Sequence, residues 1–365
     1  MNKNVHVRAH CMKEKLPSLD GWRAVSISLV LLSHCMYAGG FPPRLIPGWD
    51  AAGLGGLGVR CFFVISGFLI TWLLVSEREE TGRINLGNFY IRRVLRIFPV
   101  YFTYLGILAF LTRYWQDAPS WAGNLTFTTN FVGSPFPTFH LWTLGVEEQF
   151  YLLWPLILLL CAASGKTLPK VLLIPLVVAP VVRLLFCKRW FPDHMDWLFQ
   201  GYSFFSKCDS LAYGCIGSVL LFYHRQRVQT LYQKYFALIS WSALALIALP
   251  LLLRHMYFPP RLQAALFDCM QASGFLALLL QSILYPGKGF SRALNWRWVR
   301  HLGVLSFSIY IWQQMFCGTD FSVFGRESAW WTRFPMWIPV TLLVAHLSYY
   351  LLEKPFFSLR QKFRA

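Results

Sequence analysis

Apolar residues are grouped along this chain into about ten runs, each close to the length of a membrane-spanning helix. The runs are centred on residues 22–38, 55–76, 97–114, 141–163, 168–187, 204–223, 235–253, 264–285, 301–318 and 334–352. A helix needs about 20 predominantly apolar residues to cross the hydrocarbon core of a bilayer. The pattern therefore predicts an all-α polytopic membrane protein with about ten transmembrane helices. The sixth run is the least regular, because Lys207 and Asp209 interrupt its start.

The composition supports this interpretation. Hydrophobic residues make up 56% of the chain, charged residues make up 14%, and the mean hydropathy is +0.45. Soluble domains carry about a quarter charged residues, so a single soluble core is a poor explanation. No long linker, tandem repeat or low-complexity run divides the 365 residues. We therefore expect one transmembrane domain over residues 1–365, with any chemistry inside the helix bundle.

The formal net charge of +18 is distributed unevenly between the loops. With the N-terminus on the inner side, 22 of the 34 Lys and Arg fall in inner segments and 8 fall in outer loops. The positive-inside rule then places both termini in the cytoplasm. The basic surface is expected to face the cytosol and anionic lipid headgroups rather than nucleic acid, with room for an anionic cytosolic ligand.

Nine cysteines are scattered through the sequence, mostly within apolar runs, and none forms a Cys-x-x-Cys pair. This spacing predicts neither a metal site nor a disulfide framework. We expect most of the cysteines to serve as small apolar packing residues.

Arg23 and His34, two residues that are costly to bury in a membrane, lie on the first apolar run with ten residues between them. Eleven helical steps of about 100° bring the two side chains to within roughly 20° of each other, about 16 Å apart along the axis. A cation and an ionisable base inside a membrane helix are expensive and usually mark a functional site. The pair is therefore a candidate for catalysis, with Arg23 at the cytosolic end.

Arg60 lies in the outer half of the second run, near the depth expected of His34. It is a candidate partner for an oxyanion or for an anionic substrate group. The alternative is that its side chain extends to the outer headgroups. Ser66 and Gly67 lie in the middle of the same run, where a small pair more often permits close helix packing than supplies a nucleophile.

The fourth run contains two adjacent carboxylates, Glu147 and Glu148, in its outer half. Because charged groups are costly in a membrane, they should face the bundle interior. A carboxylate at this depth could orient the imidazole of His34 and stabilise its protonated form, as in a hydrolase triad. The alternative is a structural salt bridge inside the bundle, with Arg60 as the partner.

Three arginines, Arg92, Arg93 and Arg96, follow each other at helical spacing at the end of the longest inner loop. Apolar residues separate them, so the segment can lie in the inner interface with its guanidinium groups available to phosphate. The alternative is a simple anchor to lipid headgroups.

Five segments together resemble the signatures of acyltransferase family 3. They are LDGWRA at 19–24 with His34 eleven residues after the Arg, FFVISGFL at 62–69, RRVLRIFP at 92–99, WTLGVEEQFY at 142–151 and EKPF at 353–356. Weaker similarities lie in FSKCDSLAYG at 205–214 and SFSIYIW at 306–312. The resemblance covers almost the whole chain, in order.

The resemblance implies a ten-helix O-acyltransferase of the bacterial cytoplasmic (inner) membrane. Such enzymes transfer an acyl group, commonly acetyl, from cytosolic acyl-CoA to a hydroxyl of an extracytoplasmic glycan such as O-antigen, capsule or exopolysaccharide. Acyl-CoA is then a donor substrate, and no permanently bound cofactor or metal is expected. The essential Arg and His of the family's first helix correspond to Arg23 and His34.

Two features depart from the family's pattern. Where relatives often have a His after a Tyr-Leu-Trp in the ninth span, this chain has Gln313 after Tyr-Ile-Trp. We also expect no fused extracytoplasmic hydrolase-like domain of the kind found in some relatives. Any later transfer of the acyl group would then need a separate partner among the proteins that assemble the envelope glycan.

The basic residues at the cytosolic end fit an acyl-CoA donor. Arg92, Arg93 and Arg96 would hold the phosphates of CoA, close in depth to Arg23. The pantetheine arm is long enough to place the thioester near His34.

These residues suggest a mechanism. His34 would act as the general base for the acceptor hydroxyl, or alternatively as a transient acyl carrier. Glu147 or Glu148 would orient it, and Arg60 or Arg23 would stabilise the developing negative charge.

Two other classes of protein also fit about ten spans with interior polar residues. A transporter or flippase of a glycan or lipid-linked substrate would use intramembrane Arg, His and Glu along its pathway. A non-catalytic assembly partner is the third possibility, although it would have no need of these costly residues. The absence of an internal repeat of the polar segments favours the enzyme.

Overall fold

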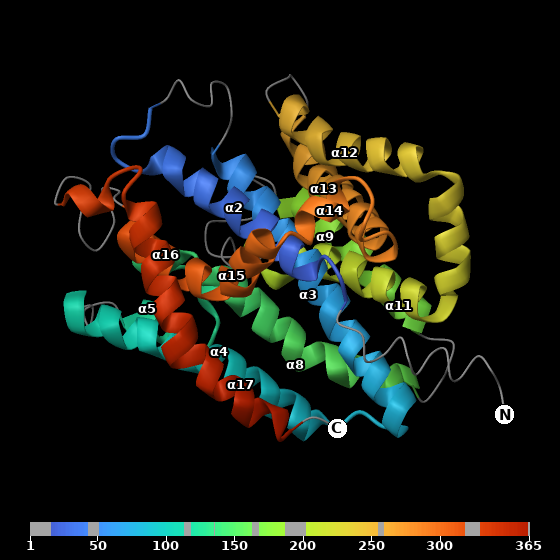
Figure 1. Ribbon diagram of the computed structural model, residues 1–365, viewed down its shortest axis with the longest axis horizontal. Helices are drawn as coiled ribbons and strands as arrows, with labels where there is room; N and C mark the ends of the chain where they lie inside the picture. Colours follow the sequence, from blue (N-terminus) through green and yellow to red (C-terminus); the bar gives the residue numbers. More distant parts are fainter. Residues whose placement is uncertain are drawn as a thin grey trace.

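The computed structural model describes residues 16–42, 51–112, 118–134, 136–162, 168–186, 202–254, 259–317 and 329–363, and within these ranges its regular structure is helical (Figure 1). This confirms the predicted all-α class. The long helices are α2 (Leu19–Tyr37), α3 (Ala51–Thr81), α4 (Leu86–Thr112), α8 (Trp142–Ala162), α9 (Leu168–Phe186), α11 (Phe204–Lys234), α12 (Phe236–Leu253), α13 (Pro260–Leu284), α15 (Arg297–Phe316) and α16 (Trp337–Ser348). Each of the ten apolar runs falls on one of these helices.

Shorter elements connect and extend the long helices. They are α5 (Ala118–Leu125), α6 (Thr129–Val132), α7 (Phe136–Phe139), α14 (Phe290–Leu294) and the 3₁₀ turn η3 (Trp330–Thr332). At the end of the chain, α16 continues through a π-helical turn, η4 (Tyr349–Glu353), into α17 (Lys354–Gln361). The basic residues of the first 15 positions, which contribute to the predicted orientation, lie outside the described residues.

Five segments of the described chain are long and apolar enough to cross a membrane. They are Gly53–Thr81, Leu86–Leu111, Pro137–Cys161, Phe236–Leu253 and Pro260–Leu284. Large apolar side chains on the outside of the bundle are widely exposed, with Phe110 on α4 86% accessible and Trp241 on α12 72% accessible. Lipid tails solvate such surfaces without cost, whereas water does not. The chain is therefore a multi-pass membrane protein.

Glycines allow α3 and α11 to pack backbone against backbone. A Cβ atom on Gly67 would lie 2.0 Å from the carbonyl oxygen of Leu211, and one on Gly214 would lie 2.1 Å from that of Val64. Small residues at helix interfaces permit this approach in membrane bundles. The packing role predicted for Gly67 is confirmed.

The first helix lies in the middle of the bundle. α2 packs against α3 on one side and α15 on another, and Figure 1 shows these helices between α12 at one edge and α4 with α17 at the other. Ile27 and Val30 of α2 are buried in the same hydrophobic core as residues of α4, α8 and α15. This position brings the polar residues of α2 next to those of four other helices.

Candidate functional site

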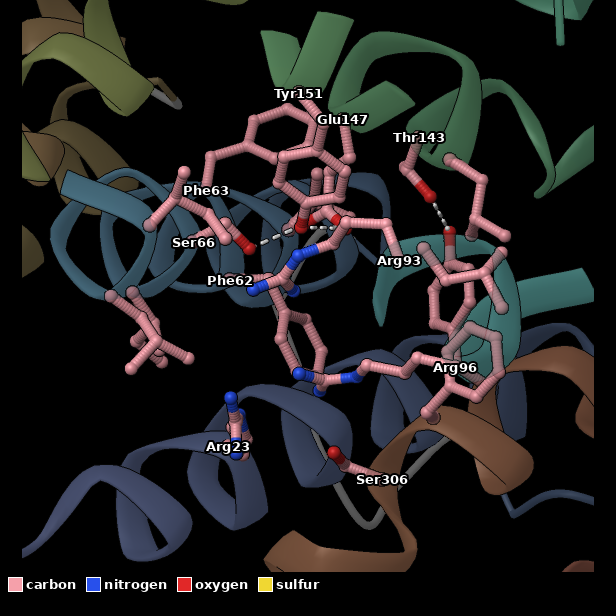
Figure 2. A pocket seen from close by; sticks show the side chains of 18 residues that line it. Arg23, Phe62, Phe63, Ser66, Arg93, Arg96, Thr143, Glu147, Tyr151 and Ser306 are labelled. Carbon is pink, nitrogen blue, oxygen red and sulfur yellow. Dashed lines mark hydrogen bonds between the residues drawn. The ribbon is translucent and has the colours of Figure 1, made fainter. Parts of the chain in front are cut away.

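A cavity lies inside the bundle where α2, α3, α4, α8 and α15 meet (Figure 2). Its volume is about 80 Å³, well above the roughly 10–15 Å³ that one water molecule requires. Its apolar wall consists of Val59, Phe62, Phe63, Ile65, Leu69, Ile70, Ile97, Leu144 and Phe307. Its polar lining consists of Arg23, Ser66, Arg93, Arg96, Thr143, Glu147, Tyr151, Ser306 and Tyr310. We call it the guanidinium cavity, after its three arginines.

The three arginines enter the guanidinium cavity from two helices. Arg23 on α2 donates to Asp20 one turn earlier, with 3.2 Å between Nη1 and Oδ1. Arg93 on α4 lies over the ring of Tyr151, 5.2 Å from its centroid. Within the described ranges, no carboxylate forms a salt bridge with Arg93 or Arg96. The cavity therefore presents cationic donors of the kind that bind phosphate groups.

The carboxylate of Glu147 lies in the same cavity. It accepts hydrogen bonds on both oxygens, from Ser66 Oγ at 2.7 Å and from the Tyr151 hydroxyl at 3.1 Å (Figure 2). Glu147 and Tyr151 are four residues apart on α8, so they share one helix face. The prediction that Glu147 faces the bundle interior is confirmed, but its contacts are with these two hydroxyls.

His34 does not line the cavity. Its Nδ1 lies 3.0 Å from Oε1 of Gln313 on α15. Because an amide oxygen only accepts hydrogen bonds, Nδ1 carries the proton in this arrangement and Nε2 keeps its lone pair. The expectation that Glu147 or Glu148 orients His34 is wrong, since the orienting partner is Gln313. Gln313, which departs from the family's pattern, thus holds the imidazole of His34 so that Nε2 can accept a proton.

A hydrogen-bonded group connects the end of the cavity to the surroundings of His34. Thr143 donates to the Tyr310 hydroxyl at 2.7 Å, and Tyr310 donates to the carbonyl oxygen of His140 at 2.8 Å. Tyr310 and Gln313 are three residues apart on α15, so the cavity ends about one helical turn, roughly 5 Å, from the residue that holds His34. The buried His140 was not among the sequence candidates, although it lies two residues before the start of the WTLGVEEQFY segment.

Arg60 lies outside the guanidinium cavity, in a separate set of buried charges that we call the ion cluster. Its Nη1 is 2.8 Å from Asp268 Oδ1 on α13. Asp268 also pairs with Lys207 of α11 at 2.7 Å, and Arg183 of α9 pairs with Asp209 at 2.6 Å. The ion cluster consists of Arg60, Arg183, Lys207, Asp209 and Asp268. The alternative that Arg60 forms a salt bridge with Glu147 or Glu148 is therefore wrong.

Two further sequence candidates also lie outside the cavity. Arg92 donates to Glu77 at 2.9 Å and to the carbonyl oxygen of Phe363 at 2.6 Å, which ties α4 to α3 and to the segment after α17. Of the three arginines predicted to hold phosphate, the structure brings only Arg93 and Arg96 to the cavity. Glu148 does not line it, and its buried Oε1 has no hydrogen-bond partner among the described residues.

Sequence reasoning missed the hydrogen bonds that Glu147 accepts from Ser66 and Tyr151. The four-residue spacing of Glu147 and Tyr151 was a signal that the sequence offered. Ser66 and Glu147 lie on different helices and are 81 residues apart in the sequence, and no local pattern indicates such a contact. Within the described ranges, no group of three His, Cys, Asp or Glu is placed to hold a metal ion. The seven cysteines in those ranges are free thiols, and Cys11 and Cys187 lie outside them.

Comparison with known proteins places this chain among acyltransferases. The profile of an acyltransferase domain family matches residues 16–353. The "Peptidoglycan O-acetyltransferase OatA" of Listeria monocytogenes is 24% identical over 371 residues, which cover 94% of this chain and 56% of that protein. The "Putative peptidoglycan O-acetyltransferase YrhL" of Bacillus subtilis is 26% identical over 373 residues, which cover 93% and 54%.

A shorter match links the chain to a "Putative O-acetyltransferase" of Staphylococcus aureus, 32% identical over 190 residues that cover 47% of this chain and 29% of that protein. The chain spans little more than half the length of the Listeria and Bacillus relatives. No solved structure matches it.

Proposed function

This chain belongs to the acyltransferase domain family, and from that premise we propose that it is a membrane O-acetyltransferase of a cell-envelope glycan. It takes an acetyl group from acetyl-CoA and transfers it to a hydroxyl of the glycan. The names of two relatives specify peptidoglycan, which makes peptidoglycan the first acceptor to test. O-antigen, capsule and exopolysaccharide are the other acceptors of this chemical class.

The observation that carries this proposal is the guanidinium cavity. Arg23, Arg93 and Arg96 meet inside an otherwise apolar bundle, beside a single carboxylate, Glu147. Buried cations in a membrane protein are costly unless an anion compensates them. The phosphates of CoA supply such an anion, and the apolar wall would face the acyl group.

His34 supplies the base in the proposed reaction. With Nδ1 donating to Gln313, Nε2 can accept the proton of the acceptor hydroxyl as that oxygen attacks the acyl carbon. Arg23 stabilises the negative charge that develops at the thioester end. Arg60, which is engaged in the ion cluster, has no direct part in this version of the mechanism.

The direction of transfer follows from the proposed topology. We place the protein in the bacterial cytoplasmic membrane, as a single domain with ten spans and both termini in the cytoplasm, as the distribution of Lys and Arg indicates. Acetyl-CoA then enters at the Arg93 end of the cavity, and the glycan approaches from the outer side near His34. A protein that assembles the envelope glycan would act as a partner if the acetyl group is passed on again.

The test uses the full chain, purified in detergent and reconstituted into liposomes. Thiol release from acetyl-CoA is measured with and without peptidoglycan fragments, and the acetylated product is identified by mass spectrometry. Acceptor-dependent release is expected for the wild type. Loss of a general base costs about 10²- to 10⁴-fold in rate, so His34→Ala should lose transfer by that factor and still insert into the membrane.

The matched control is His224→Ala, because His224 is an exposed residue of α11 away from the cavity. It should transfer acetyl groups at the wild-type rate. Full activity of His34→Ala would remove the proposed mechanism. If no acceptor elicits thiol release while a lipid-linked glycan crosses the proteoliposome membrane, the protein is a transporter instead.

A further inference from the structure

Ser66 and Tyr151 both line the cavity and donate to its carboxylate, and Ser66 makes the shorter of the two hydrogen bonds. Its Oγ lies 2.7 Å from Glu147 Oε1, and Figure 2 shows it pointing toward Glu147 from the wall formed by α3. Its neighbour Gly67 packs against α11, which turns the serine toward the cavity. The sequence suggested that this small pair serves packing, whereas in the structure only the glycine does.

The arrangement around Ser66 has the three parts of an activated nucleophile. A hydroxyl lies within hydrogen-bond distance of a base, and the base is in turn oriented by a third group. Here the base is Glu147, and the Tyr151 hydroxyl holds its second oxygen at 3.1 Å. Arg23, Arg93 and Arg96 line the same cavity, so cationic donors are available for an oxyanion or a departing thiolate.

We propose that Ser66 carries the acetyl group as a covalent ester between acetyl-CoA and the glycan acceptor. The inference rests on the proposed function, and it assigns a catalytic residue that is distinct from His34. The two residues then act in separate half-reactions. Glu147 serves as the base in the first, and His34 serves as the base in the second.

In the first half-reaction, Ser66 Oγ attacks the carbonyl carbon of the thioester. The Oγ–C bond forms, the C–S bond breaks, and the serine proton moves to the Glu147 carboxylate. The CoA thiolate leaves toward the guanidinium groups and takes a proton from water on the donor side, which leaves a hydroxide ion there. The products are acetyl-Ser66, protonated Glu147, free CoA thiol and that hydroxide ion, which the proton later released by His34 balances.

In the second half-reaction, the acceptor hydroxyl attacks the ester carbon from the Thr143–Tyr310 end of the cavity. Its proton leaves to Nε2 of His34, and protonated Glu147 returns its proton to Ser66 Oγ as the C–Oγ bond breaks. His34 then releases its proton to the acceptor side. Both residues return to their starting states, and the acetyl group has moved from sulfur to oxygen.

The first test is incubation of the purified full-length protein with acetyl-CoA in the absence of any glycan. The expected result is one equivalent of rapid thiol release, and a mass increase of one acetyl group on the proteolytic peptide that contains Ser66. In His34→Ala this burst should persist, because only the second half-reaction needs His34. An acetyl group on His34 in place of Ser66 would overturn the proposal.

Variants keep the proposal testable if the ester is too short-lived to isolate. Removal of a catalytic nucleophile costs several orders of magnitude, so Ser66→Ala should lose both the burst and transfer by at least about 10³-fold. Ser66→Cys keeps a nucleophile of similar size and should retain an acetylated protein, now as a thioester. The matched control is Ser26→Ala, because Ser26 is a fully buried α2 serine bonded to the Trp22 carbonyl oxygen at 2.9 Å.

The outcomes separate this inference from the proposed function. If the wild type acetylates glycan and Ser66→Ala does so at a comparable rate, the serine ester is wrong and direct transfer stands. If the wild type neither releases thiol nor acetylates any glycan, both the function and the ester are wrong. If Ser66→Ala and Ser26→Ala lose activity and thermal stability together, the role of Ser66 is structural and the proposal is overturned.

Discussion

The guanidinium cavity and the ion cluster both bury cations inside one membrane protein, and they do so in opposite ways. In the ion cluster, Arg60 and Lys207 both reach the carboxylate of Asp268, at 2.8 and 2.7 Å. In the cavity, Arg93 and Arg96 form no salt bridge with any described carboxylate. One set of charges is compensated by the protein itself, whereas the other leaves donors facing an open space.

The difference indicates which cations belong to the fold and which to the chemistry. A buried ion pair fixes helices relative to each other, and breaking it leaves an uncompensated charge in a medium of low dielectric constant. The ion cluster joins α3, α9, α11 and α13 in this way. Cations around a cavity contribute little to the fold, and the charge of a bound anionic ligand neutralises them.

The largest effect on stability is expected from Asp268→Asn. This change removes the carboxylate shared by Arg60 and Lys207, and breaking a buried pair costs about 3–5 kcal/mol. The loss of stability is measured as a fall in the midpoint of thermal unfolding in detergent. The comparison variant is Glu147→Gln in the cavity, which should lose turnover but keep a midpoint close to that of the wild type. Equal midpoints for the two variants would contradict the distinction between the two regions.

The next largest effect is expected from Arg96→Gln, and it should appear in substrate binding. A charge-assisted hydrogen bond contributes about 1.5–3 kcal/mol, so the KM for acetyl-CoA should rise by about 10- to 100-fold. Steady-state kinetics with a fixed glycan concentration measure this change, and thermal unfolding should be unaffected. A fall in the unfolding midpoint with an unchanged KM would show that Arg96 stabilises the fold, as the cations of the ion cluster do, and does not bind the donor.

A smaller effect is expected from Gln313→Ala, which removes the hydrogen bond that fixes the ring of His34. The loss of one such bond costs about 1 kcal/mol, so kcat should fall several-fold while the KM for acetyl-CoA stays constant. Gln313→His retains a group able to accept from Nδ1 and should recover part of the activity. A change in KM without a change in kcat would show that Gln313 acts on the donor instead.

The smallest effect on substrate binding is expected from Arg92→Gln, which sharpens the comparison within a single helix. Arg92 bonds to Glu77 and to the Phe363 carbonyl oxygen outside the cavity. Neither Arg92 nor Glu77 lines the cavity, so the KM for acetyl-CoA should change little. The two side chains are only 18% and 8% exposed, so the loss should appear as a lower unfolding midpoint. A rise in KM as large as that of Arg96→Gln would restore the sequence-based prediction that all three arginines hold phosphate.

The helices themselves were largely predictable. Each of the ten apolar runs lies on a long helix. A segment that crosses a bilayer must be apolar over about 20 residues and must satisfy its own backbone hydrogen bonds, and a single helix meets both requirements locally. The interior position of Glu147 was also predictable, since charges avoid lipid. Arg93 and Arg96 were expected in the inner interface, whereas the structure places them on the cavity.

The partners were less predictable. Arg60 bonds to Asp268, 208 residues away, and His34 bonds to Gln313, 279 residues away. The sequence placed Arg60, His34 and the two glutamates at similar depths, and depth alone suggested contacts among them. Helices at one depth can face different neighbours, so rotation and packing decided which side chains met.

By itself, then, the sequence determined the helical class, the apolar spans, and the residues too costly to be placed in a membrane without a partner. The tertiary structure divided those residues into a neutralised ion cluster and an open cavity, and it gave Ser66 a carboxylate partner. The physical reason is that a charged residue within an apolar run can be recognised in the sequence, and so can the cost of burying it. Its compensation depends on which atoms of distant helices lie within about 3 Å, the range of a hydrogen bond.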